Sequence, residues 1–142
     1  MIYFITNEKR HKVTDTEDLK VVSLNKGFNL IHQFFIKSTQ RIEGDIFESD
    51  KRFYCGLDTE TNGLSPFNNK LMLFQVGNEL HQFVIEVYSD DAKSLIIDLI
   101  NKLNRWVIWI GANLKFDIKM ILQELNVRPD ELYDTQIAEQ TI

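Results

Sequence analysis

Apolar and polar residues follow two different patterns along this chain of 142 residues. Short apolar runs bounded by turn-forming residues predict strands, whereas apolar residues spaced three and four positions apart predict helices. The strand pattern occurs at residues 2–5, 20–24, 53–57, 71–76, 81–85, 106–110 and 132–133. The helical pattern occurs at residues 28–36, 92–103, 114–125 and 135–142.

The elements of residues 51–142 follow the order β-β-β-α-β-α-β-α. Three consecutive strands joined by short turns predict an antiparallel meander, and the helices that follow cross over to further strands. We therefore expect an α/β fold with a mixed sheet and helices on its faces. Residues 1–50 predict a small N-terminal ββα appendage without recognisable chemistry.

The composition limits the functional classes. The apolar content of 44% is enough for a core, but no apolar run approaches the roughly 20 residues that a membrane helix needs. A single cysteine, Cys55, lies in an apolar run, and no secretory signal is recognisable, so we expect a reduced, cytoplasmic protein. The net charge of −5 argues against a protein that coats duplexes, yet a metal-dependent nuclease is compatible with it.

Asp58 and Glu60 form the first candidate site, at the end of the predicted strand 53–57. Residues i and i+2 of a strand point to the same face, so the two carboxylates would project together and repel one another. A bound Mg²⁺ or Mn²⁺ would remove this conflict, since both ions prefer oxygen ligands. The same tripeptide at residues 15–17 has no strand before it and predicts a solvated loop.

Asn113 and Asp117 form the second candidate site, at the start of the predicted helix 114–125. Their i, i+4 spacing places both on one face of the helix. Taken alone, the segment is typical of an N-cap asparagine and a surface aspartate. Taken together with Asp58 and Glu60, it favours an acid that points inward over the sheet.

Two segments carry a family resemblance. Residues 57–64, Leu-Asp-Thr-Glu-Thr-Asn-Gly-Leu, resemble the first exonuclease motif of the DnaQ-like (DEDD) superfamily, and residues 111–117 resemble the second. The sequence Asn-Leu-Lys-Phe-Asp in the second motif resembles the corresponding motif of the proofreading domain of family-A DNA polymerases, with ribonuclease D as a more distant relative. Residues 73–77 and 133–138 are also similar in kind and order, and the element order is that of the ribonuclease-H-like fold.

The resemblance implies a 3′-5′ exonuclease that hydrolyses phosphodiesters with two divalent ions about 3.5–4 Å apart. Asp58 would bridge both ions, Glu60 would bind the hydrolytic ion, and Asp117 would hold the second. The implied partner is the 3′ end of single-stranded DNA. The residues implied to bind this substrate are Thr61, Leu64, Asn113 and Phe116; Asn113 would position the scissile phosphate and Leu64 would wedge against the terminal base.

The third motif of the family is a Tyr or His followed four residues later by an Asp, and no such pair occurs after Asp117. We therefore expect a fold truncated at the C-terminus and an impaired activity of this chain alone. The apolar face left uncovered would need the rest of a polymerase chain, or a partner, to cover it. Three alternatives stay open: an RNA exonuclease like ribonuclease D, a silent nucleic-acid-binding or interaction module, and an ordinary α/β domain with solvated acids.

Overall fold

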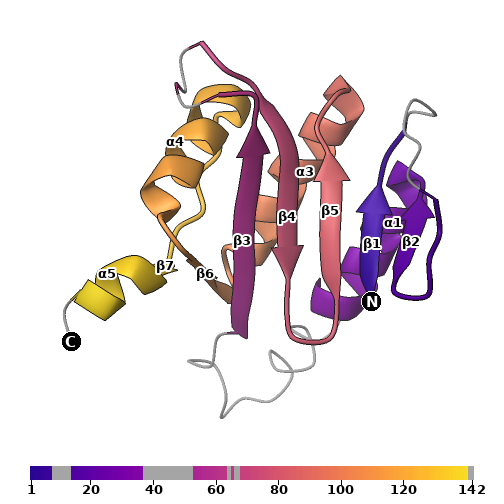
Figure 1. Cartoon of the computed structure of the whole chain (residues 1–142), viewed down its shortest axis with the longest axis horizontal. Helices are drawn as coiled ribbons and strands as arrows, with labels where there is room; N and C mark the ends of the chain where they lie inside the picture. Colours follow the sequence, from indigo (N-terminus) through magenta and orange to yellow (C-terminus); the bar gives the residue numbers. More distant parts are fainter. Residues whose placement is uncertain (8–13, 37–52, 64, 66–67, 141–142) are drawn as a thin grey trace.

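The computed structural model describes residues 1–7, 14–36, 53–63, 65 and 68–140 (Figure 1). The strands are β1 (Ile2–Ile5), β2 (Leu19–Val22), β3 (Phe53–Thr61), β4 (Leu71–Gly77), β5 (Gln82–Glu86), β6 (Val107–Gly111) and β7 (Leu132–Asp134). The helical elements are α1 (Leu24–Ile31), the π-helix η1 (His32–Ile36), α3 (Asp90–Leu103), α4 (Leu114–Leu125) and α5 (Thr135–Gln140).

The strands form one seven-stranded mixed sheet in the order β2-β1-β5-β4-β3-β6-β7. Strands β3, β4 and β5 make the predicted antiparallel meander, and β6 and β7 extend it in parallel on the side of β3. The β-β-β-α-β-α-β-α order predicted for the main part of the chain is therefore confirmed. The crossovers β5-α3-β6 and β6-α4-β7 run in the same direction across the sheet, so right-handed connections place both helices on one face.

The N-terminal elements extend this same sheet. Strand β1 pairs in parallel with β5, from Ile2 opposite Gln82 to Ile5 opposite Ile85, and β2 pairs with β1. The predicted ββα order is present, but β2 ends at residue 22 and α1 begins at residue 24, four positions before the predicted helix. The reason is Ser23, whose hydroxyl accepts a hydrogen bond from the Lys26 N–H at 3.3 Å and caps the helix.

The core lies between the sheet and the helices α1, α3 and α4. Helix α3 runs behind the meander in Figure 1, and an ion pair between Lys93 of α3 and Glu124 of α4 places α4 on the same side. Along β3 the side chains alternate between the two faces of the sheet, and Cys55, Leu57 and Thr59 are the ones buried under the helices. Among the largest fully buried side chains are Trp109, Phe74, Phe83, Ile5, Ile31 and Leu71.

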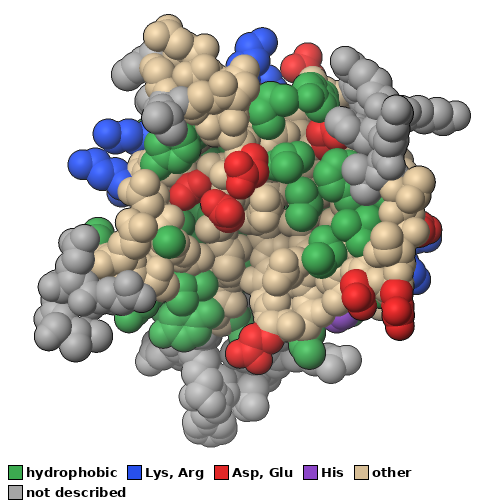
Figure 2. All heavy atoms as spheres, in the orientation of Figure 1, with side chains coloured by type: hydrophobic (Ala, Val, Ile, Leu, Met, Phe, Trp, Pro, Cys, Tyr) green, Lys and Arg blue, Asp and Glu red, His purple; other side chains and the backbone are tan. Residues whose placement is uncertain are grey.

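The opposite face of the sheet is hollowed. Gly56 of β3 and Gly77 of β4 lie directly opposite one another, so bare backbone forms part of the floor. The hollow has a volume of about 930 Å³ and extends from this floor toward Asp58, Val84 and Ile110. Figure 2 shows this face, with hydrophobic and acidic side chains side by side over the strands. Among the described residues, no helix has the length and apolar character needed to cross a membrane.

Candidate functional site

Asp58 and Glu60 lie within β3, which continues to Thr61 instead of ending at Asp58 as the sequence suggested. Both side chains are exposed, whereas Thr59 between them is buried, so the two acids share the open face of the sheet. Cross-strand pairing places Gln75 of β4 opposite Asp58 and Leu73 opposite Glu60. The i, i+2 spacing therefore puts the two carboxylates side by side, at the edge of the hollow.

Asp117 approaches β3 from the helix-covered side. It is only 4% exposed, and its Oδ1 accepts a hydrogen bond from the hydroxyl of Thr59, itself 7% exposed. Burial raises the pKa of the Asp117 carboxyl, and the negative charge of Asp58 raises it further, while the Thr59 hydrogen bond acts in the opposite direction. Asp117 thus points inward, to the Thr59 hydroxyl on the helix-covered face of β3, whereas Asp58 and Glu60 are exposed on the opposite face.

The three acids fit a divalent cation by their chemistry. Carboxylate oxygens are the ligands that Mg²⁺ and Mn²⁺ prefer, and the repulsion between Asp58 and Asp117 is a conflict that a cation relieves. Over the part of the chain that the structure describes, however, no three His, Cys, Asp or Glu side chains converge closely enough to hold one ion. The metal-binding roles of Asp58, Glu60 and Asp117 therefore remain predictions.

Asn113 precedes α4 in a left-handed backbone conformation, with φ 55° and ψ 45°, which asparagine tolerates better than most residues. Its side chain makes no capping hydrogen bond to the helix. Asn113 therefore occupies the N-cap position, as the sequence suggested, but its side chain does not cap the helix. The N-terminus of α4 is satisfied by a residue from elsewhere.

That residue is Asp134, at the end of β7. Its carboxylate accepts hydrogen bonds from the N–H groups of Leu114 at 2.8 Å, Asn113 at 3.2 Å and Gln136 at 2.9 Å. Burial acts to raise the pKa of Asp134, but these N–H groups outweigh it and hold the pKa below its ordinary value. Asp134 thus holds the starts of α4 and α5 together. The sequence predicted a helix from residue 135 but gave no sign of these bonds.

The predicted substrate-binding residues have different surroundings. Thr61 donates a hydrogen bond from its hydroxyl to the carbonyl oxygen of Gly63 at 2.5 Å, which shapes the turn after the acids. Phe116 is half-buried in the first turn of α4, and its N–H donates to the Asn113 carbonyl at 3.2 Å. Leu64 lies outside the described residues. Nothing in this arrangement tests a role of these residues in binding a substrate.

Sequence comparison gives one family for the chain. The model of a family described as 3′-5′ exonuclease matches residues 35–142, about three quarters of the chain. No curated protein matches the chain.

Solved structures share the fold. The NrnC protein of Brucella melitensis with bound Mg²⁺ is similar at 20% identity and a TM-score of 0.54, over 67% of this chain and 47% of that one. The same protein bound to pGG is similar at 20% identity and a TM-score of 0.50, over 66% and 46%. The catalytic core of RRP6 from Trypanosoma brucei is similar at 14% identity and a TM-score of 0.53, over 72% and 28%. The chain spans less than half of each of these proteins, and the predicted ribonuclease-H-like fold is confirmed.

Proposed function

The chain belongs to the 3′-5′ exonuclease family, and on that premise we propose that Asp58, Glu60 and Asp117 form its catalytic metal site. The substrate we propose is the 3′ end of single-stranded DNA. The observation that carries the proposal is the close approach of α4 to β3, where Asp117 accepts a hydrogen bond from Thr59, the residue between Asp58 and Glu60, and where burial and the charge of Asp58 raise the Asp117 pKa. An ordinary α/β domain has no need of two repelling acids at this position.

The chain's own residues would have distinct roles. Asp58 and Glu60, exposed on one face of β3, would hold Mg²⁺ or Mn²⁺ there, and Asp117 would join them by turning from Thr59. Two such ions would supply an activated water and neutralise the leaving 3′ oxygen. Asn113, whose side chain does not cap α4, would bind the scissile phosphate. Thr61, Leu64 and Phe116 would line the path of the terminal nucleotide.

DNA is the first candidate substrate because the amino-acid sequence of residues 113–117 is similar to that of polymerase proofreading domains. The chain would then act in DNA replication in the cytoplasm, together with the rest of a polymerase or another partner. RNA is the second candidate, because NrnC, a protein of similar fold, has been solved bound to pGG. Digestion of matched single-stranded DNA and RNA by the protein would separate the two candidates.

The test of the metal site is a calorimetric Mn²⁺ titration of the chain and of Asp58→Ala. We expect binding by the unchanged chain and its loss in the variant, which would support a metal site at β3 even without turnover. Asp15→Ala is the matched control, because Asp15 begins a second, identical Asp-Thr-Glu tripeptide at residues 15–17, outside the proposed site. Absence of binding in the unchanged chain would contradict the proposal and favour a silent interaction module.

A further inference from the structure

Helix α4 is attached to the sheet at two points. Asp117 and Glu124 are seven residues apart, so they lie two turns apart on one face of the helix, roughly 10 Å along its axis. Asp117 accepts a hydrogen bond from Thr59 of β3. Glu124 accepts one from the backbone N–H of Leu71 at 2.5 Å, where β4 begins. Leu71 pairs with Thr61, two residues after Thr59, so both attachments hold the stretch of sheet that carries the acids.

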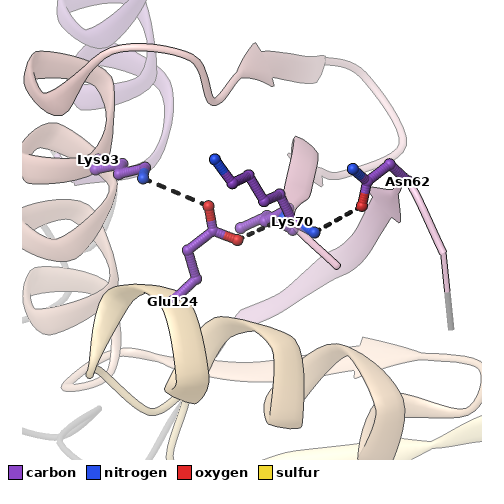
Figure 3. A network of polar contacts seen from close by, with 5 residues as sticks. Asn62, Lys70, Lys93 and Glu124 are labelled. Atoms are coloured by element: carbon purple, nitrogen blue, oxygen red, sulfur yellow. Dashed lines mark hydrogen bonds and ion pairs between the residues drawn. The ribbon is translucent and has the colours of Figure 1, made fainter. Parts of the chain in front are cut away.

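The negative charge of Glu124, the residue of the second attachment, is compensated by a lysine. Lys93 of α3 places its Nζ 3.4 Å from Glu124 Oε1, opposite the oxygen that faces Leu71 (Figure 3). The Glu124 side chain is 14% exposed and that of Lys93 33%, so water screens this pair less than an exposed pair. The exposed pair Lys102–Asp98, with both side chains more than half exposed, is a natural comparison on the same helix α3.

The sheet is irregular at the place that Glu124 holds. The register between β3 and β4 shifts between Glu60 and Thr61. Beyond the shift, Asn62 accepts a hydrogen bond from the Lys70 N–H at 2.6 Å and donates its own N–H to the Lys70 carbonyl at 3.1 Å. The turn that follows Glu60 is therefore fixed next to Leu71, and side chains replace part of the interrupted ladder.

We propose that Glu124 is a positioning residue for the acidic site, a role that rests on the function proposed above. Its bond to Leu71 fixes the position of α4 along β3. That position determines where Asp117 lies relative to Asp58. Lys93 supports this role by compensating the Glu124 charge. Glu124 itself touches neither the substrate nor the metal ions.

The test compares Mn²⁺ affinity by calorimetry with stability by urea unfolding, in the full chain. Glu124→Leu removes the acceptor for Leu71, and we expect Mn²⁺ affinity to fall by about tenfold, the low end of the range for residues bonded directly to metal ligands, because Glu124 acts through the position of α4. Glu124→Gln keeps an acceptor and should restore affinity to within about threefold of the unchanged chain. Hydrogen exchange at the Leu71 amide, measured without metal, should accelerate in the leucine variant and much less in the glutamine variant.

Asp98→Asn is the matched control, since it breaks an ion pair on α3 without touching α4. A folded Glu124→Leu protein that binds Mn²⁺ as tightly as this control would overturn the positioning role. The proposed function would survive that result as long as Asp58→Ala abolishes binding, whereas absence of binding in the unchanged chain would overturn both. If Glu124→Leu does not fold, Lys93→Met decides: it should weaken Mn²⁺ binding, and unchanged affinity in this variant would contradict the role.

Discussion

Thr59 and Asp117 lie 58 positions apart in the chain and are joined by a hydrogen bond from the Thr59 hydroxyl to Asp117 Oδ1. Thr59 stands between Asp58 and Glu60, but its side chain points to the opposite face of β3. The bond therefore holds α4 against the part of β3, residues 58–60, that carries the two exposed acids. It joins the two exonuclease motifs.

Replacement of Thr59 by valine tests this link. Thr59→Val keeps the size of the side chain but removes the hydroxyl that lowers the Asp117 pKa, so that pKa should rise further. We expect a loss of about 1 kcal/mol in the free energy of unfolding, and Mn²⁺ binding that requires a higher pH than in the unchanged chain. Calorimetric titrations at several pH values measure the effect. Thr59→Ser retains a hydroxyl, and an equal shift in that variant would refute the explanation.

The stability of the protein should depend on the ionisation of Asp117. Its pKa in the folded state is raised above 3.8, so the stabilising protonated form is fully present below that value and is lost as the pH rises through the folded pKa. Asp117→Asn removes the buried charge, and we expect it to be more stable at pH 7 by about 1 kcal/mol. Urea unfolding between pH 4 and 8 should show this advantage shrinking toward pH 4. A constant difference across the range would count against a titrating Asp117.

Asp134 should stabilise the N-termini of the two helices α4 and α5. Asp134→Ala removes the acceptor of the Leu114 and Gln136 amides, which should then exchange hydrogen faster. Since the Asp134 pKa is lowered, its contribution is present above the ordinary value and is lost only as the pH falls through the lowered pKa. NMR exchange rates measure both effects. Asp134→Asn is the control, because its amide oxygen still accepts, and it should protect these amides better than alanine does.

Cys55 should behave as a packing residue. It is fully buried on β3, and burial raises the pKa of its thiol to about 12, with a hydrogen bond from the Gly77 backbone acting in the other direction. Only the thiolate reacts readily, so the folded protein should not react with a thiol reagent at pH 8. The same protein in urea should react fully. Rapid labelling of the folded protein would show that β3 opens near the acids.

The sequence predicted the parts of the fold that depend on local patterns. Apolar runs located the strands, and the alternation along a strand placed Asp58 and Glu60 on one face. The start of α1 was missed because a single hydroxyl, that of Ser23, decides it against a longer apolar pattern. The bonds of Asp134 were missed because they join a side chain to backbone amides of a helix 20 residues earlier, which no periodicity records.

The direction in which Asp117 points could be predicted only in part. The segment around Asp117, taken together with Asp58 and Glu60, indicated an inward acid, and the structure buries Asp117. Its partner, Thr59, could not be predicted, since threonine is common in strands and its spacing from Asp117 carries no local signal. The pairing of β1 with β5 had no sequence signal either, because any two apolar strands of similar length could pair.

Strand β1 makes the order of folding events matter. It is the first strand of the chain, yet it lies inside the sheet, between β2 and a strand about 80 residues later. Closing so long a loop is slow, whereas the meander β3-β4-β5 needs only short turns. The meander is therefore expected to form early, with one side of β5 bare until β1 arrives. During that interval, or after loss of the first 36 residues, the bare edge can pair with the same edge of another copy and start aggregation.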